Sequence, residues 1–177
     1  MSKQLISTGL AIAVVALAVS AAVASDGGDR NRRHHVKASL DGYQVAPKSL
    51  ATNGSGKFEA RIDDHDMTID FELSYEDLEG GAVSFAHIHL GQRATGGSGD
   101  MSAYLCGGPK PACPAGGTVT GVLFPSDVVG PSGQGIAPGD FKKLVRAIRS
   151  GATFVDVHTM GRPAGEIRGQ IKDRGDQ

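Results

Sequence analysis

Hydrophobic and polar residues alternate with a period of two along two neighbouring stretches of the chain, residues 57–63 and 67–75. A short polar turn, residues 63–66, joins the two stretches. Alternation of this kind is typical of a strand with one buried and one solvated face, and two such runs around a short turn predict a β-hairpin. The predicted buried positions are Phe58, Ala60, Ile62, Met67, Ile69, Phe71, Leu73 and Tyr75.

Six further segments, most of them separated by Gly-rich turns, have the composition of short strands. They are residues 37–40, 82–90, 101–106, 118–124, 153–158 and 166–172. Many short strands with turns between them favour an antiparallel sandwich or barrel. We therefore expect one all-β domain.

One segment departs from this pattern, because its apolar residues recur at the spacing of a helix. These residues are Phe141, Leu144, Val145 and Ile148. Asp140 is a favourable N-cap and Gly151 a favourable C-terminal stop. We predict one short amphipathic helix that covers a sheet edge or a barrel end.

Length and composition indicate one folded domain and argue against a nucleic-acid partner. The 177-residue length fits a single core, and a hydrophobic content of 40% argues against extensive disorder. The charges nearly cancel, with 18 Lys and Arg against 19 Asp and Glu. No strong field therefore attracts nucleic acid, and we expect no nucleic-acid partner.

The N-terminus has the organisation of a secretory signal peptide. A short basic start precedes an apolar run at residues 10–19, and a small-x-small cleavage site follows at residues 22–24. We predict a signal peptide at residues 1–24, a flexible polar leader at residues 25–35 and a secreted or periplasmic protein with no stable membrane span after cleavage. An uncleaved membrane anchor is the alternative.

Export changes the interpretation of the two cysteines, Cys106 and Cys113. They flank a Gly- and Pro-rich hexapeptide, and an oxidising compartment favours a disulfide across it. A redox motif is usually the tighter Cys-x-x-Cys. We expect a structural disulfide.

Three histidines are the best candidates for chemistry. His87 and His89 occupy positions i and i+2 of a predicted strand, so their rings share one face about 6.5–7 Å apart along the strand. Two imidazoles at that spacing can share a transition-metal ion, and His158 from another predicted strand can supply a third ligand. One Cu or Zn ion is the candidate cofactor. In the alternative interpretation these imidazoles only hydrogen-bond to backbone and to acids, and stabilise one end of the sheet.

Two residues near His158 can support such a site. Glu166 can orient a ligand histidine from outside the coordination sphere, or it can pair with Arg168. Glu166 has no visible carboxylate partner for acid–base catalysis, and the common hydrolase, phosphate-loop and metalloprotease motifs are absent. We assign no catalytic residue.

Two motifs resemble the CHRD domain, which occurs in chordin and as a single exported domain in bacteria. The first is Ala-His-Ile-His-x-Gly at residues 86–91, and the second is His-Thr followed by Pro and Gly-Glu-Ile-Arg-Gly-Gln at residues 158–170. The resemblance runs from about residue 38 to 171, and we assign the domain to residues 36–173, with residues 174–177 as a tail. It implies an immunoglobulin-like or superoxide-dismutase-like β-sandwich and brings no settled activity.

The His-x-His strand is also similar to that of copper/zinc superoxide dismutases, which hold two metals with more histidines and an aspartate. Because His34, His35 and His65 lie in a predicted tail and turn, three histidines are left here. We do not expect a two-metal site.

Three functions stay open. The first is a noncatalytic exported module whose histidines are structural or bind one metal ion. The second is a copper-dependent redox enzyme of the superoxide type. The third is an extracellular protein-interaction or matrix module, with a protein partner that the sequence does not identify.

Overall fold

The computed structural model describes residues 34–92 and 100–173. The predicted signal peptide, most of the predicted leader and the predicted tail lie outside these residues. Within them the chain is mostly β with one short helix, as the sequence predicts.

The strands fall on the predicted segments, but β8 begins at Arg162, four residues before the predicted start at residue 166. They are β1 (His34–Asp41), β2 (Ser55–Asp63), β3 (Thr68–Glu76), β4 (Val83–Leu90), β5 (Asp100–Cys106), β6 (Gly117–Leu123), β7 (Thr153–Thr159), β8 (Arg162–Gln170) and β9 (Lys172–Asp173). The helix is α1 (Phe141–Arg149), and short 3₁₀ turns lie at η1 (Gly42–Gln44), η3 (Pro125–Asp127) and η4 (Ser132–Gln134).

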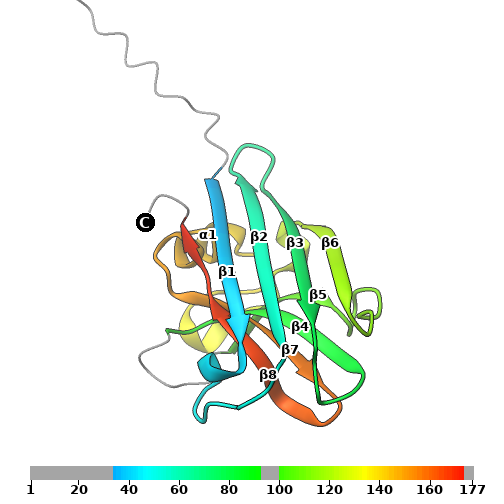
Figure 1. The fold of residues 1–177 in the computed structure, drawn as a ribbon. Coiled ribbons are helices and arrows are strands. Elements are labelled where there is room, and N and C mark those ends of the chain that lie inside the picture. Colours follow the sequence, from blue (N-terminus) through cyan, green and yellow to red (C-terminus); the bar gives the residue numbers. More distant parts are fainter. Residues whose placement is uncertain (1–33, 93–99, 174–177) are drawn as a thin grey trace, which may run out of the picture. The chain divides into compact units, whose positions relative to one another are not determined.

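The strands of the described residues form one antiparallel sheet in the order β5-β4-β7-β8-β1-β2-β3-β6, and β9 pairs with β1. Figure 1 shows β1, β2, β3 and β6 side by side in one half of this sheet, and β4, β7 and β8 in the other half. The sheet nearly closes into a barrel. The alternation left a sandwich and a barrel open, and the described strands form a single curved sheet that stops short of full closure.

The predicted hairpin is formed by β2 and β3, and its register places the apolar side chains of both strands on the same face. Ala60 lies opposite Phe71, and Ile62 lies opposite Ile69, so apolar side chains meet on the inner face. A slip of one residue would turn that whole set toward solvent. The prediction was wrong at Met67, which lies in the turn with φ 51° and is 39% exposed, because the turn needs a left-handed residue there.

Helix α1 adds its apolar face to the core. All four predicted apolar residues are buried: Phe141, Leu144, Val145 and Ile148. Burial of each such side chain contributes about 1.5–3 kcal/mol. The Asp140 side chain accepts a hydrogen bond from the Lys143 backbone N–H, and Gly151 follows the helix with φ 68°. In the parts of the chain that the structure describes, no helix is long and apolar enough to cross a membrane.

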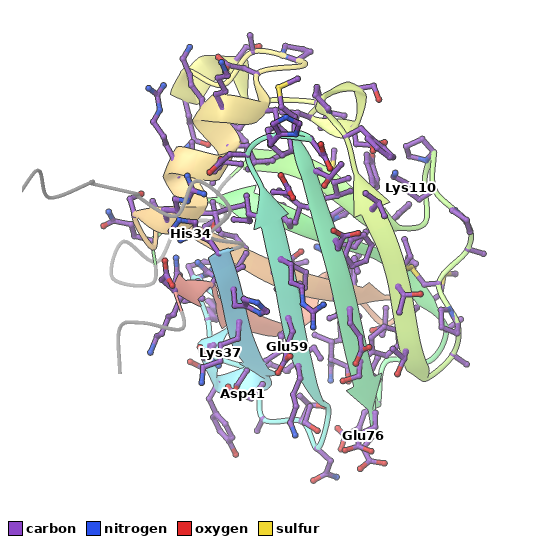
Figure 2. The ribbon with its side chains drawn as sticks, turned by 90° about the horizontal axis from the view of Figure 1, so that it is seen from above. His34, Lys37, Asp41, Glu59, Glu76 and Lys110 are labelled. Carbon is purple, nitrogen blue, oxygen red and sulfur yellow. A yellow bond between two sulfur atoms is a disulfide. The ribbon has the colours of Figure 1, made fainter. Side chains whose placement is uncertain are left out.

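Strand β1 begins at His34, three residues before the predicted start at residue 37. His34 and His35 were assigned to a flexible leader, but they pair with Ile62 and Arg61 of β2. The backbone pairing of β1 with β2 therefore starts before Val36, the first apolar residue of β1. Backbone pairing does not require an apolar side chain at each position. Figure 2 shows His34 at one end of β1 and Asp41 at the other.

A candidate metal centre on the outer face of β4 and β7

Strands β4 and β7 are neighbours, and their register brings the candidate residues together. His87 lies opposite Asp156, and Phe85 lies opposite His158. The intervening residues Ile88 and Val157 are fully buried in the core. Because successive side chains of a strand point to opposite faces, the histidines and Asp156 share the outer face.

The ligand atoms of four side chains converge on one small volume. His87, His89, Asp156 and His158 each offer one atom, and these atoms all lie within 4.8 Å of one another. Asp156 Oδ1 lies 3.1 Å from His158 Nε2, 3.2 Å from His89 Nε2 and 3.7 Å from His87 Nδ1. The histidines predicted from the sequence are therefore brought together, and Asp156 joins them.

The three separations from Asp156 Oδ1 are close to those between ligands of one transition-metal ion. Ligands about 2.0–2.1 Å from a tetrahedral ion lie roughly 3.3–3.4 Å from one another. The three distances from Asp156 Oδ1 fall on both sides of that value, so small side-chain movements bring the donors to bonding distance. The donor set of three imidazole nitrogens and one carboxylate oxygen is one that Zn and Cu accept.

Three of the donor atoms are buried without a hydrogen bond. They are His87 Nδ1, Asp156 Oδ1 and His158 Nε2. Leaving a buried polar atom without a partner costs about 1–3 kcal/mol, so three such atoms facing one point require an explanation. A bound cation provides one, because it takes a lone pair from each.

The tautomer of His158 gives a second reason to place a cation in the cluster. Its Nδ1 lies 2.9 Å from the Pro163 carbonyl oxygen, and because a carbonyl only accepts, Nδ1 carries the proton. In the neutral ring the Nε2 lone pair then faces Asp156 Oδ1, itself an acceptor, across 3.1 Å. Two acceptors repel at that distance unless a proton or a metal ion lies between them. Backbone support of this kind is usual for ligand histidines.

The charges of the cluster follow from burial and from these contacts. Burial opposes ionisation of Asp156, but the three histidines outweigh it and hold the pKa of that carboxyl well below its ordinary value. Burial lowers the pKa of His87. Burial also disfavours a charged His158, but Asp156 overcomes it and raises the pKa of that ring.

Aromatic residues hold two of the imidazoles in place. The His87 ring stacks on Phe85 with centroids 5.6 Å apart and meets the edge of Tyr104 at 4.8 Å. The His89 ring stacks on Phe154 at 4.9 Å. These contacts restrict the ring orientations, which lowers the entropic cost of binding a ligand at the cluster.

The sequence interpretation missed Asp156. The signal was present, since Asp156 and His158 occupy positions i and i+2 of one strand, the same relation that singled out His87 and His89. A carboxylate is common on any strand, so the spacing alone did not separate Asp156 from an ordinary surface acid.

Glu166 lies on β8, and its carboxylate holds two loops in place. It accepts hydrogen bonds from the Thr52 and Thr159 hydroxyls and from the Glu79 and Gly80 backbone N–H groups, at 2.6–3.0 Å. Burial opposes its ionisation, but these donors lower the pKa of Glu166. Its described contacts reach the cluster only through Thr159, the neighbour of His158, so any support for a ligand is indirect.

Arg168 lies closer to the cluster than Glu166 does. It faces Asp156 across the β7–β8 ladder, and its guanidinium carbon lies 3.6 Å from the centre of the Phe154 ring. Both Arg168 and Asp156 are buried, at 4% and 7% exposure. The stacking holds the guanidinium beside the ring that also supports His89.

The predicted disulfide is present between Cys106 and Cys113. Cys106 is the last residue of β5 and lies opposite Ala86, the neighbour of His87. The bond anchors the Gly- and Pro-rich loop to the end of the strand that pairs with β4.

Comparisons with known proteins agree with the resemblance seen in the sequence. Residues 36–171 match the CHRD domain. No curated protein and no solved structure matches the chain. The match covers β4, β7 and all four residues of the candidate centre.

Proposed function

The chain belongs to the CHRD domain family, and from the geometry of its four donors we propose that it binds one divalent transition-metal ion, copper or zinc. The ligands are His87, His89, Asp156 and His158. One observation carries the proposal: His158 Nε2 and Asp156 Oδ1 face each other at 3.1 Å inside a buried site, while His158 Nδ1 lies 2.9 Å from the Pro163 carbonyl oxygen.

The donor set favours a transition metal over the alkaline-earth ions. Calcium takes six to eight oxygen ligands and magnesium prefers oxygen and water. Imidazole suits zinc, copper, iron and nickel, and three of the four donors here are imidazoles. Asp156 contributes the one negative charge, so the site with a divalent ion carries a charge of about +1 if each histidine is neutral.

A buried ion pair is the competing explanation of the same geometry. In it a proton on His158 takes the place of the metal and pairs with Asp156. This arrangement satisfies His158 but leaves His87 Nδ1 without a hydrogen bond. A metal ion satisfies both atoms together, which is why we favour it.

We propose further that the protein is an exported, noncatalytic module. The sequence of residues 1–24 supports export, and the disulfide suits an oxidising compartment. The cluster contains no second carboxylate for acid–base chemistry among the described residues. The ion in this proposal stabilises the β4–β7 face and offers a coordination position to external ligands.

Calorimetric titration tests the metal site. The chain from Ser25, the predicted mature start, is titrated with Cu²⁺ and with Zn²⁺ at neutral pH. We expect one ion per chain, binding that His158→Ala removes, and binding that His65→Ala leaves intact, since His65 is exposed in the β2–β3 turn.

A second control removes adventitious binding at the start of β1. His34→Gln together with His35→Gln eliminates a pair of adjacent imidazoles that can hold Cu²⁺ without the cluster. One-to-one binding that persists in this double variant supports the proposal. Full-affinity binding by His158→Ala, or no binding by any form, would refute it.

A further inference from the structure

A cavity of about 260 Å³ lies directly beside the donor cluster. His89, Asp156 and His158 form one side of it. The other lining residues are Val45, Ala46, Pro47, Phe154, Ala164, Gly165 and Arg168. An ion held by the cluster therefore borders a space that a second molecule can enter.

The cavity meets the cluster on one side only. Three of the four donors line it, whereas His87 does not and is in contact with Phe85 and Tyr104 instead. Four protein ligands fill a tetrahedral zinc site, whereas a tetragonal copper site can add a fifth ligand. The open coordination position would face the cavity.

Gly165 keeps this side open. A Cβ atom there would lie 3.8 Å from His158 Cε1 and 3.9 Å from Asp156 Oδ2, and its backbone φ is +105°. A longer side chain at this position would extend over the two donors. The left-handed φ favours glycine, so the backbone conformation also keeps the approach clear.

The charges around the cavity favour an anion. A divalent ion and the Asp156 carboxylate together leave one positive charge, and the Arg168 guanidinium also lines the cavity. Among the described residues that line the cavity, Asp156 is the only acidic one. Val45, Ala46 and Ala164 form part of an apolar wall, which lowers the local dielectric and strengthens the attraction for a negative group.

The volume limits the ligand to a small molecule. A water molecule takes up about 30 Å³ of liquid volume and pockets for drug-sized ligands start near 300 Å³. A few heavy atoms with one anionic group fit this space. A guanidinium held flat against a ring presents paired N–H donors, which suit a carboxylate.

We propose that the cavity binds a small monoanion of the carboxylate type, held between the metal ion and Arg168. This inference rests on the proposed metal site, because the ion supplies one of the two attachment points. Arg168 supplies the other, and the wall around Val45 and Ala164 sets the size limit.

Azide is a suitable probe, because it is a small monoanion whose coordination to Cu²⁺ produces a charge-transfer absorption. The chain is first loaded with one equivalent of Cu²⁺, and its paramagnetic resonance spectrum is recorded. Azide and then acetate are added, and both signals are followed. We expect saturable binding of each anion at one site.

Two variants distinguish anion binding in the cavity from metal binding at the cluster. Ala164→Leu fills the cavity from an exposed position, and Ala115→Leu is the matched control in an exposed loop outside it. We expect Ala164→Leu to weaken azide binding about tenfold or more, with an unchanged copper spectrum before azide is added. Arg168→Met should weaken acetate by a similar factor through loss of the charged donors.

The outcomes distinguish the two proposals. No one-to-one copper signal would overturn both the metal site and the anion site. A normal copper signal that azide leaves unchanged would overturn the anion site alone, as would equal azide affinity in Ala164→Leu and Ala115→Leu. If Arg168→Met does not fold, the Ala164→Leu comparison decides.

Discussion

The outer face of β1, β2 and β3 and the outer face of β4 and β7 arise from the same alternation of residues, but their side chains are in different surroundings. On the first face Glu59, Arg61 and Asp70 are exposed. On the second, His87 and Asp156 are 8% and 7% exposed. Figure 2 shows Lys37 of β1 beside Glu59 of β2 on the first face.

The difference shows that strand alternation assigns a face but does not determine its chemistry. An exposed pair of opposite charges contributes about 0–1 kcal/mol, because water already solvates both groups. When such groups are buried they need hydrogen-bond or ionic partners, since each buried polar atom without a partner lowers the stability of the fold. The β4–β7 face is therefore the one on which a single substitution should change binding.

The largest effect is expected from Asp156→Asn. This change keeps the shape but removes the only negative ligand, so affinity for Cu²⁺ or Zn²⁺ should fall more than about 100-fold. Calorimetry measures the loss. Asp70→Asn, the same change on the exposed face, should leave affinity unaltered, and equal affinities in the two variants would contradict the assigned ligand set.

Glu166→Gln should have the next largest effect, on stability. The amide cannot accept all four hydrogen bonds as well as the carboxylate, and the cost is about 2–3 kcal/mol at neutral pH. Chemical denaturation measures it, with Glu72→Gln on exposed β3 as a control expected to change stability by less than about 0.5 kcal/mol.

The pH dependence of Glu166 has a definite sign. Its folded-state pKa lies below the ordinary value of 4.5, so its stabilisation is fully present above that value and is lost as the pH falls through the folded pKa. Wild type should lose stability relative to Glu166→Gln over that acid range. A constant difference between the two proteins at all pH values would show that ionisation of Glu166 does not contribute.

Gly169→Ala tests the junction between the two faces, where β8 lies against β1. An added Cβ would lie 2.8 Å from the Ser39 carbonyl carbon and would also collide with its oxygen. Backbone atoms cannot move aside as a side chain can, so we expect a loss of about 1–3 kcal/mol. Gly133→Ala, where nothing lies within 4 Å, is the control in thermal unfolding.

The smallest effect belongs to the exposed face. Arg61 and Asp70 lie opposite each other on β2 and β3, and a double-mutant cycle to alanine should give a coupling of about 0.2–1 kcal/mol that salt reduces. Unfolding at low and high salt measures it. A larger, salt-independent coupling would mean that this face is not solvated as the structure indicates.

Much of the fold was predictable, because periodicity in the sequence reflects burial directly. The hairpin of β2 and β3, helix α1 and most other strands follow the predicted segments. The exceptions have local causes. Met67 was assigned to the core but adopts a left-handed turn conformation, and His34 was assigned to a leader but pairs with β2 through its backbone.

The candidate site was predictable in part. His87 and His89 share a face by strand geometry alone, and the choice of His158 as a partner rested on its place late in another strand. That β4 and β7 are adjacent depends on the order of the strands in the sheet. Asp156 becomes a candidate only once that adjacency is known.

The sequence by itself determined which residues alternate between the inner and outer faces, where the helix begins and ends, and which imidazoles share a strand. These properties depend on neighbours in the chain. Only the tertiary structure decided that the sheet nearly closes, that Asp156 meets three histidines, and that a cavity beside them contains Arg168. These properties depend on contacts between distant segments, which are set by packing of the whole core and not by local spacing.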